Sequence, residues 1–103
     1  MAQFGLLYVG EPQFDDPNEA QAHQQKWFDW IGSLGDAVVN PGMPMGPPTR
    51  VTADGVGPGP TEGRLTGITI VEAEDLDAAV EMAKSSPYVE VATVDVVQIF
   101  QMG

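Results

Sequence analysis

Apolar, β-branched and aromatic residues mark four segments of the chain as strands. These segments are Gln3–Val9, Ala37–Val39, Arg64–Glu72 and Val91–Met102. In the third segment Ile68 and Ile70 share one face, and the smaller Gly67 and Thr69 share the other. In the last segment the apolar positions change phase after Val96, which predicts either a bulge or burial on both faces.

Two other segments repeat apolar residues at steps of three and four, which is the period of a helix. The first helix is expected from Pro17 to Leu34, with Asp16 as its N-cap, Glu19 in a capping box and Gly35 as its C-terminal cap. The second is expected to begin at the N-cap Asp75 and to break at Ser86-Pro87. The stripe of the first helix must face a core and consists of Ala20, His23, Trp27, Trp30, Ile31 and Leu34.

Between the second and third strands, residues 41–63 hold six of the nine prolines and six of the twelve glycines, which predicts a long loop. Thr49–Thr52 is expected to form a brief extended segment before a turn at Asp54-Gly55. Loops of this length are uncommon in compact domains, and they are either functional or simply mobile spacers. We expect this one to be the most mobile part of the domain and to border a cleft that contains His23.

The resulting order of elements, β-α-β-β-α-β, predicts an α+β domain of the ferredoxin-like kind, with two helices on one face of an antiparallel sheet. The first and last strands carry large apolar residues on both faces, so one set would lie in water in a monomer. These residues are Phe4, Leu6 and Tyr8 against Leu7 and Val9, and Phe100 and Met102 against Val97 and Ile99. Sheet-to-sheet packing in a homodimer is therefore expected.

The length and net charge of the chain limit the number of domains and the kinds of partner that it can bind. A chain of 103 residues has room for one core, so residues 1–103 are expected to form one domain. Fifteen acidic residues against four Lys and Arg give a formal charge of −11, which disfavours nucleic acid and membrane surfaces as partners. The absence of cysteine suits a reducing compartment, and no signal or anchor segment is evident, so a cytoplasmic protein is expected.

Several short motifs, in order along nearly the whole chain, together resemble the YCII-related family. They are Ala22-His23 through Trp27, Ser33–Asp36, Asn40–Pro47, Thr66-Gly67, Glu72–Val80 and Ser86-Pro87. The resemblance implies a ferredoxin-like fold that pairs into a dimeric α/β barrel. It also implies an active-site role for a histidine in the first helix and an aspartate after the second, and one type of member resembles an enzyme that eliminates HCl from a chlorinated aromatic. His23 matches the histidine, whereas Ser86 stands at the aspartate position.

His23 is the only histidine, and its side chain titrates near neutral pH, which makes it the candidate general acid or base. The alternative is a core imidazole that is hydrogen-bonded to a backbone carbonyl. A base needs an orienting group, and Asp95 is the remaining carboxylate candidate, although a strand residue flanked by Val94 and Val96 can equally point into solvent.

Three further residues are candidate ligand contacts. Trp27 could line an apolar pocket, although aromatic residues at helical spacing are more often core. Arg50 and Arg64 flank the long loop and could bind an anionic substrate, or they could pair with Asp54 and Glu62. The Gly- and Pro-rich run at 55–60 lacks the Gly-Lys-Ser/Thr of a phosphate loop, and the chain shows no metal-ligand spacing, so no cofactor is expected.

Three functions remain open from the sequence. The first is a domain that binds a small organic ligand in a cleft lined by His23, Trp27 and residues of the last strand. The second is a cofactor-free lyase or isomerase in which His23 moves a proton. The third is a non-catalytic structural or interaction module.

Overall fold

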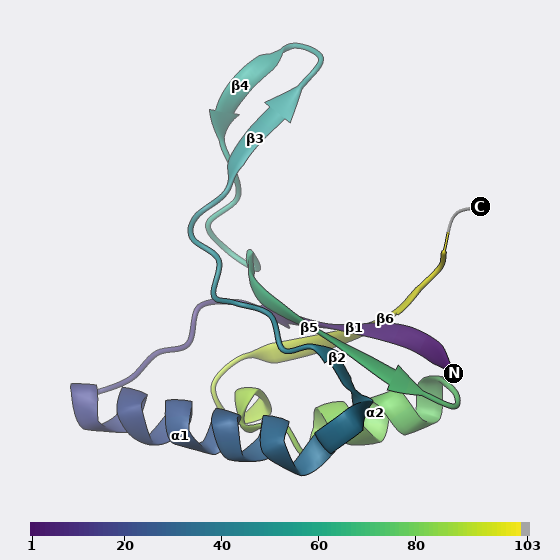
Figure 1. Cartoon of the computed structure of the whole chain (residues 1–103). Helices are drawn as coiled ribbons and strands as arrows, with labels where there is room; N and C mark the ends of the chain where they lie inside the picture. The colour runs from purple at the N-terminus through teal and green to yellow at the C-terminus, as the bar shows by residue number, and fades with distance from the viewer. Residues whose placement is uncertain (102–103) are drawn as a thin grey trace.

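The computed structural model describes residues 1–101, and in it two helices cover one face of an antiparallel sheet (Figure 1). The sheet has the order β2-β5-β1-β6, formed by β2 (Val38–Asn40), β5 (Leu65–Ala73), β1 (Ala2–Val9) and β6 (Thr93–Ile99). The helices are α1 (Pro17–Leu34) and α2 (Leu76–Lys84), and they are followed by the short 3₁₀ helices η1 (Gly35–Ala37) and η2 (Pro87–Glu90). This is the ferredoxin-like α+β arrangement that the sequence predicts.

Side chains from just outside each helix cap its first turn. The Asp16 carboxylate accepts from the Glu19 amide at 3.0 Å, and the Glu19 carboxylate accepts in return from the Asp15 amide at 2.9 Å. Asp75 accepts from the Ala78 amide at 2.9 Å. Within residues 1–101, neither helix is long and apolar enough to cross a membrane.

The core lies between the helices and the sheet face that they cover. Its buried members are Phe4, Leu6, Trp30, Val71, Ala73, Ala79 and Ala83. The Trp30 indole N–H donates to the Ser85 hydroxyl at 2.9 Å and to the Met82 carbonyl at 3.2 Å, so it also joins α1 to the end of α2. Burying this large ring with its polar atom satisfied fixes how the two helices pack.

The other face of the sheet carries the second apolar set, and neither helix covers it (Figure 1). Leu7 pairs with Ile68 on one side and Asp95 on the other, so these three side chains share this face. We call it the open face, and its residues are Gln3, Gly5, Leu7, Ile68, Ile70, Glu72, Asp95, Val97 and Ile99. The pairing of β6 with β1 is regular, so the phase change after Val96 reflects a strand with apolar residues on both faces rather than a bulge.

Several expected boundaries differ from the structure, and those of β1 and β5 differ by one residue. The long loop contains a second, separate sheet, the hairpin of β3 (Thr49–Thr52) and β4 (Gly55–Pro58), and only its first strand was expected. The expected strand Ala37–Val39 is shifted to Val38–Asn40 because the helical turn η1 follows α1 directly. The last strand begins at Thr93 because η2 precedes it, and it ends at Ile99; the expected end at Met102 lies outside the described residues.

Candidate functional site

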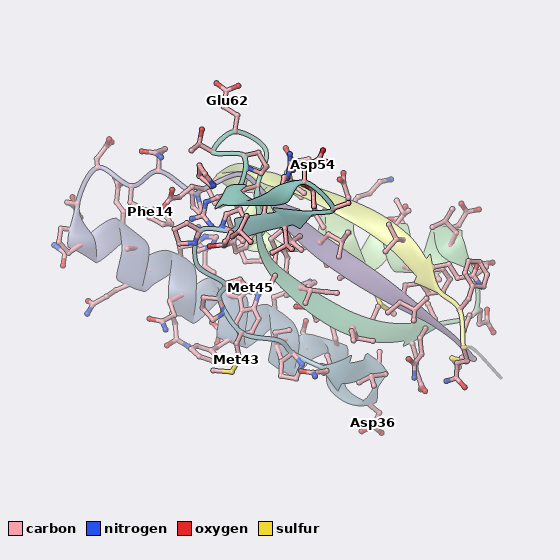
Figure 2. All side chains as sticks on the ribbon, turned by 90° about the horizontal axis from the view of Figure 1, so that it is seen from above. Phe14, Asp36, Met43, Met45, Asp54 and Glu62 are labelled. Carbon is pink, nitrogen blue, oxygen red and sulfur yellow. The ribbon has the colours of Figure 1, made fainter. Side chains whose placement is uncertain are left out.

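A cavity of about 360 Å³ opens between α1, the segment after β2 and the beginning of β5. It is lined by His23, Gln24, Trp27 and Phe28 of α1, by Pro41, Gly42, Met43 and Pro44, by Thr66, Gly67 and Ile68 of β5, and by Tyr8 and Tyr88. His23 and Trp27 therefore line the same cavity, but no residue of β6 does, so the expected contribution of the last strand was wrong. The first residues of the long loop border the same pocket, and Figure 2 shows Met43 and Met45 on the α1 side of the molecule.

Aromatic rings pack around His23. Tyr8 and Tyr88 stack with their ring centroids 4.3 Å apart, and the His23 ring meets Tyr88 at a steep angle with centroids 5.2 Å apart. Phe14, from the segment before α1, lies 5.3 Å from His23 on another side. Packing alone therefore holds the imidazole in one orientation.

A chain of hydrogen bonds links the pocket wall to the sheet. The Thr69 hydroxyl donates to the Pro41 carbonyl at 2.9 Å, so its oxygen must accept the proton of the Tyr8 hydroxyl, which lies 2.5 Å away. The Trp27 indole N–H donates in turn to the Tyr8 oxygen at 3.4 Å. Burial raises the pKa of Tyr8, although its bonds to Thr69 and Trp27 oppose this shift, so the phenol is neutral at neutral pH.

Gly42 is required for the close approach of the Pro41–Pro44 segment to β5. It has a φ of 80°, and a Cβ atom built there would lie 1.6 Å from the Ile68 carbonyl oxygen. Only glycine fits against a backbone at that distance. The Gly42 amide donates to the Asn40 side chain at 2.8 Å, and the Met45 amide donates to the Thr66 carbonyl at 2.8 Å, so both ends of the segment are fixed.

The two nitrogens of His23 lie in different surroundings. Nε2 is buried and has no hydrogen-bond partner within residues 1–101. Burial lowers the pKa of His23 below its ordinary value, while the charge of Glu90 acts in the opposite direction. Glu90 also pairs with Lys26 at 3.5 Å, and that cation favours the neutral imidazole too. His23 is therefore neutral at neutral pH.

Neither Ser86 nor Asp95 lines the cavity. Ser86 is 2% exposed, and its hydroxyl accepts from the Tyr88 amide at 3.2 Å, so it caps η2. Asp95 is exposed on the open face, on the opposite side of the sheet from α1. The carboxylate that acts electrostatically on His23 is instead Glu90, which the sequence analysis did not single out as a site residue.

Neither arginine lines the pocket. The Arg64 guanidinium donates to the Met45 carbonyl at 3.4 Å and pairs with Glu11 at 3.4 Å, rather than with Glu62. Arg50 lies on the exposed hairpin, and among residues 1–101 it makes no ion pair with Asp54 or any other acid. In the same part of the chain, no three His, Asp or Glu side chains gather where they could hold a metal ion.

Sequence reasoning missed Tyr8, Tyr88 and Thr69 as site residues. Tyr8 was noted only as an apolar residue on the same strand face as Phe4 and Leu6. Thr69 was noted only as a small residue on its strand face, although a threonine that faces a helix needs a hydrogen-bond partner. Tyr88 follows Ser86-Pro87, the position after the second helix to which the family resemblance assigns an active-site residue. That proximity was the one signal in the sequence that could have pointed to Tyr88.

The fold and this pocket define a ferredoxin-like α+β domain with an aromatic cavity between its first helix and its sheet. The YCII-related domain family matches residues 15–103, and the chain belongs to that family. No match was found among curated proteins.

Among solved structures, the chain is similar to 5-chloro-2-hydroxyhydroquinone dehydrochlorinase from Burkholderia phenoliruptrix AC1100, in complex with 2,5-dihydroxybenzoquinone. The TM-score is 0.56 and the sequence identity is 14%, and the match covers 97% of this chain and 95% of that one. At this identity the similarity establishes the fold.

The lowered pKa of His23 predicts how stability depends on pH. The unfolded chain, with an ordinary histidine pKa near 6.5, binds the proton more readily than the folded chain does. This contribution to stability is therefore present above about pH 6.5 and is lost as the pH falls through the lower pKa of the folded state. His23→Asn should flatten the rise of the thermal midpoint between about pH 5 and 8, as measured by circular dichroism. The exposed variant Gln25→Asn is the control, and parallel curves for wild type and His23→Asn would contradict the assignment.

Proposed function

We propose that this protein binds a small, flat aromatic or quinoid molecule in the pocket beside His23. The observation that carries the proposal is the cavity of about 360 Å³, because ligand pockets of about 300–1,000 Å³ lined by aromatic side chains are typical small-molecule sites. Its walls include the rings of Tyr8, His23, Trp27 and Tyr88, which offer faces and edges to a planar ligand.

No arginine or unpaired lysine lines the pocket, so recognition of a ligand there depends on ring packing and hydrogen bonds rather than on an ion pair. Neither arginine lines the cavity, and the nearest cation, Lys26, is paired with Glu90. The polar side chains of the lining include His23 and Gln24, which suit a ring hydroxyl or carbonyl. The related dehydrochlorinase supports this choice, since its complex contains 2,5-dihydroxybenzoquinone.

A second candidate function is that of a cofactor-free lyase or isomerase with His23 as the general acid or base. The observation that favours it is a neutral imidazole in the pocket wall, held in place by Tyr88 and Phe14, because a base must be unprotonated and correctly oriented. In a dehydrochlorination, His23 would take a proton from the substrate, and the electrons of that broken bond would form a new double bond. Chloride would leave with the electrons of the carbon–chlorine bond, and the two losses add up to HCl.

We further propose that the functional unit is a homodimer that buries the open face. Leu7, Ile68, Ile70, Val97 and Ile99 form a contiguous apolar surface there, and one layer of helices cannot cover both faces of a sheet.

Ligand binding should quench the fluorescence of Trp27, one of two tryptophans and the one in the pocket. Titration with 2,5-dihydroxybenzoquinone is expected to saturate, and Met43→Ala should weaken binding severalfold because it removes a pocket wall. Met45→Ala is the matched control, since Met45 follows two residues later and does not line the cavity. Equal affinities for the two variants would contradict binding at this site.

The second function predicts chloride release from 5-chloro-2-hydroxyhydroquinone that depends on His23. His23→Asn should reduce the rate by at least about 100-fold, the size of a lost general acid or base. Its affinity in the fluorescence titration should fall by much less, because His23 is one of several residues that line the pocket. Undiminished turnover by the variant would exclude His23 as the proton carrier. The proposal that the pocket binds a ligand would not be affected, because the fluorescence titration tests it separately.

Static light scattering of the whole chain should give about twice the 11.0 kDa chain mass at micromolar concentration. Val97→Asp should shift the mass toward the monomer because it places a charge on the open face. The control Val89→Asp lies on η2, away from that face, and should not change the mass.

A further inference from the structure

The β3–β4 hairpin stands away from the body of the domain, and we call residues 49–58 the arm (Figure 1). Val51 and Val56 pair with each other across it, and each is 72% exposed. All of β3 is exposed. A two-stranded hairpin with no surface to pack on is at best marginally stable in water. The arm therefore has the features of an element that is stabilised by contact with another molecule.

The size of the chain's surface supports this conclusion. The chain exposes 6956 Å², about 1,300 Å² more than the roughly 5,600 Å² expected for a folded monomer of its mass. Its radius of gyration is 15.0 Å, against about 12.8 Å expected for a compact domain of this length. A standard protein–protein interface buries about 800 Å² on each partner, so the excess surface is enough for one.

The position of the arm favours a second copy of this chain as the partner. The arm rises on the side of the open face, and the view from above shows it lying over the sheet (Figures 1 and 2). A copy that packs its open face against this one must therefore contact the arm. By two-fold symmetry, its own arm makes the same contact in return.

Charge favours the same partner. Of the four Lys and Arg residues, three pair within the protomer: Lys26 with Glu90, Arg64 with Glu11, and Lys84 with Glu81. The fourth, Arg50, lies on the arm. The open face contains Glu72 and Asp95, so Arg50 of one copy can approach acidic residues of the other. The acid of the arm itself, Asp54, lies in its turn, beyond the paired residues Thr52 and Gly55.

We propose that the arm clasps a second copy of this chain, with Val51 and Val56 packed against its apolar surface and Arg50 facing its acidic residues. The proposal rests on the homodimer proposed above and adds that the arm is required for it. The base of the arm is compact, since the Gly59 amide donates to the Pro48 carbonyl at 3.0 Å. The arm can therefore be removed without disturbing the pocket segment Pro41–Pro44.

The test compares dimer dissociation constants by sedimentation velocity over a dilution series. One variant replaces residues 49–58 by Asn-Gly, a pair that favours a two-residue turn, and another carries Val51→Ser and Val56→Ser. Both should dissociate at least about tenfold more readily than the full chain, given the apolar area lost from the interface. Far-UV circular dichroism should show that the helices of both variants are intact. Arg50→Glu should also weaken the dimer, by more than the control Lys84→Glu, which changes the net charge equally.

The outcomes separate this proposal from the one on which it rests. If the full chain has the mass of a monomer at every concentration, the homodimer is wrong and the arm has no such role. If the full chain is a dimer and the armless chain dissociates no more readily, the arm proposal alone is overturned.

Discussion

The structure depends on one constraint: the sheet has apolar residues on both faces, but its single layer of helices can cover only one of them. Successive side chains of β1 point to opposite faces, so Phe4 and Leu6 face the helices and Leu7 lies on the open face. Trp30 then locks α1 against α2 through its bonds to Ser85 and Met82, so neither helix can move to the second face without breaking the core. The uncovered apolar surface is thus a direct consequence of how the core is built.

The pocket follows from the same packing, through a difference in side-chain size along β5. Near the Trp30 end of α1, the helix-facing positions of β5 carry Val71 and Ala73, which fill the layer. Near the His23 end, the position paired with Tyr8 is Gly67, where an added Cβ atom would lie 3.1 Å from the Tyr8 ring. The missing side chain leaves space beside Tyr8, and the stripe of α1 that is core at one end lines a cavity at the other.

The fold could be read from the sequence because its signals are local. Asp16, Asp75 and Gly35 mark helix ends through bonds within a few residues, and the strands show apolar residues with a period of two.

The site could be predicted only in part, because it depends on contacts between residues far apart in the chain. His23 and Trp27 were found by their helical spacing, whereas the bond between Tyr8 and Thr69 spans 61 positions and leaves no local pattern. The arm was missed for a related reason: β4 is Gly-Val-Gly-Pro, which has little strand propensity alone and pairs only because β3 lies opposite.

The pocket and the open face are not independent surfaces, since both involve the same stretch of chain. Ile68 lines the cavity and also lies on the open face, and its carbonyl is the atom against which Gly42 fits. The segment after Gly42 continues directly into the arm. A ligand that contacts Pro41–Pro44 therefore acts on residues next to the arm, which is the proposed dimer contact. By linkage, any ligand that binds the dimer more tightly than the monomer must strengthen the dimer by the corresponding free energy. In this fold, ligand affinity and assembly are expected to depend on each other through Ile68 and the segment that lies on it.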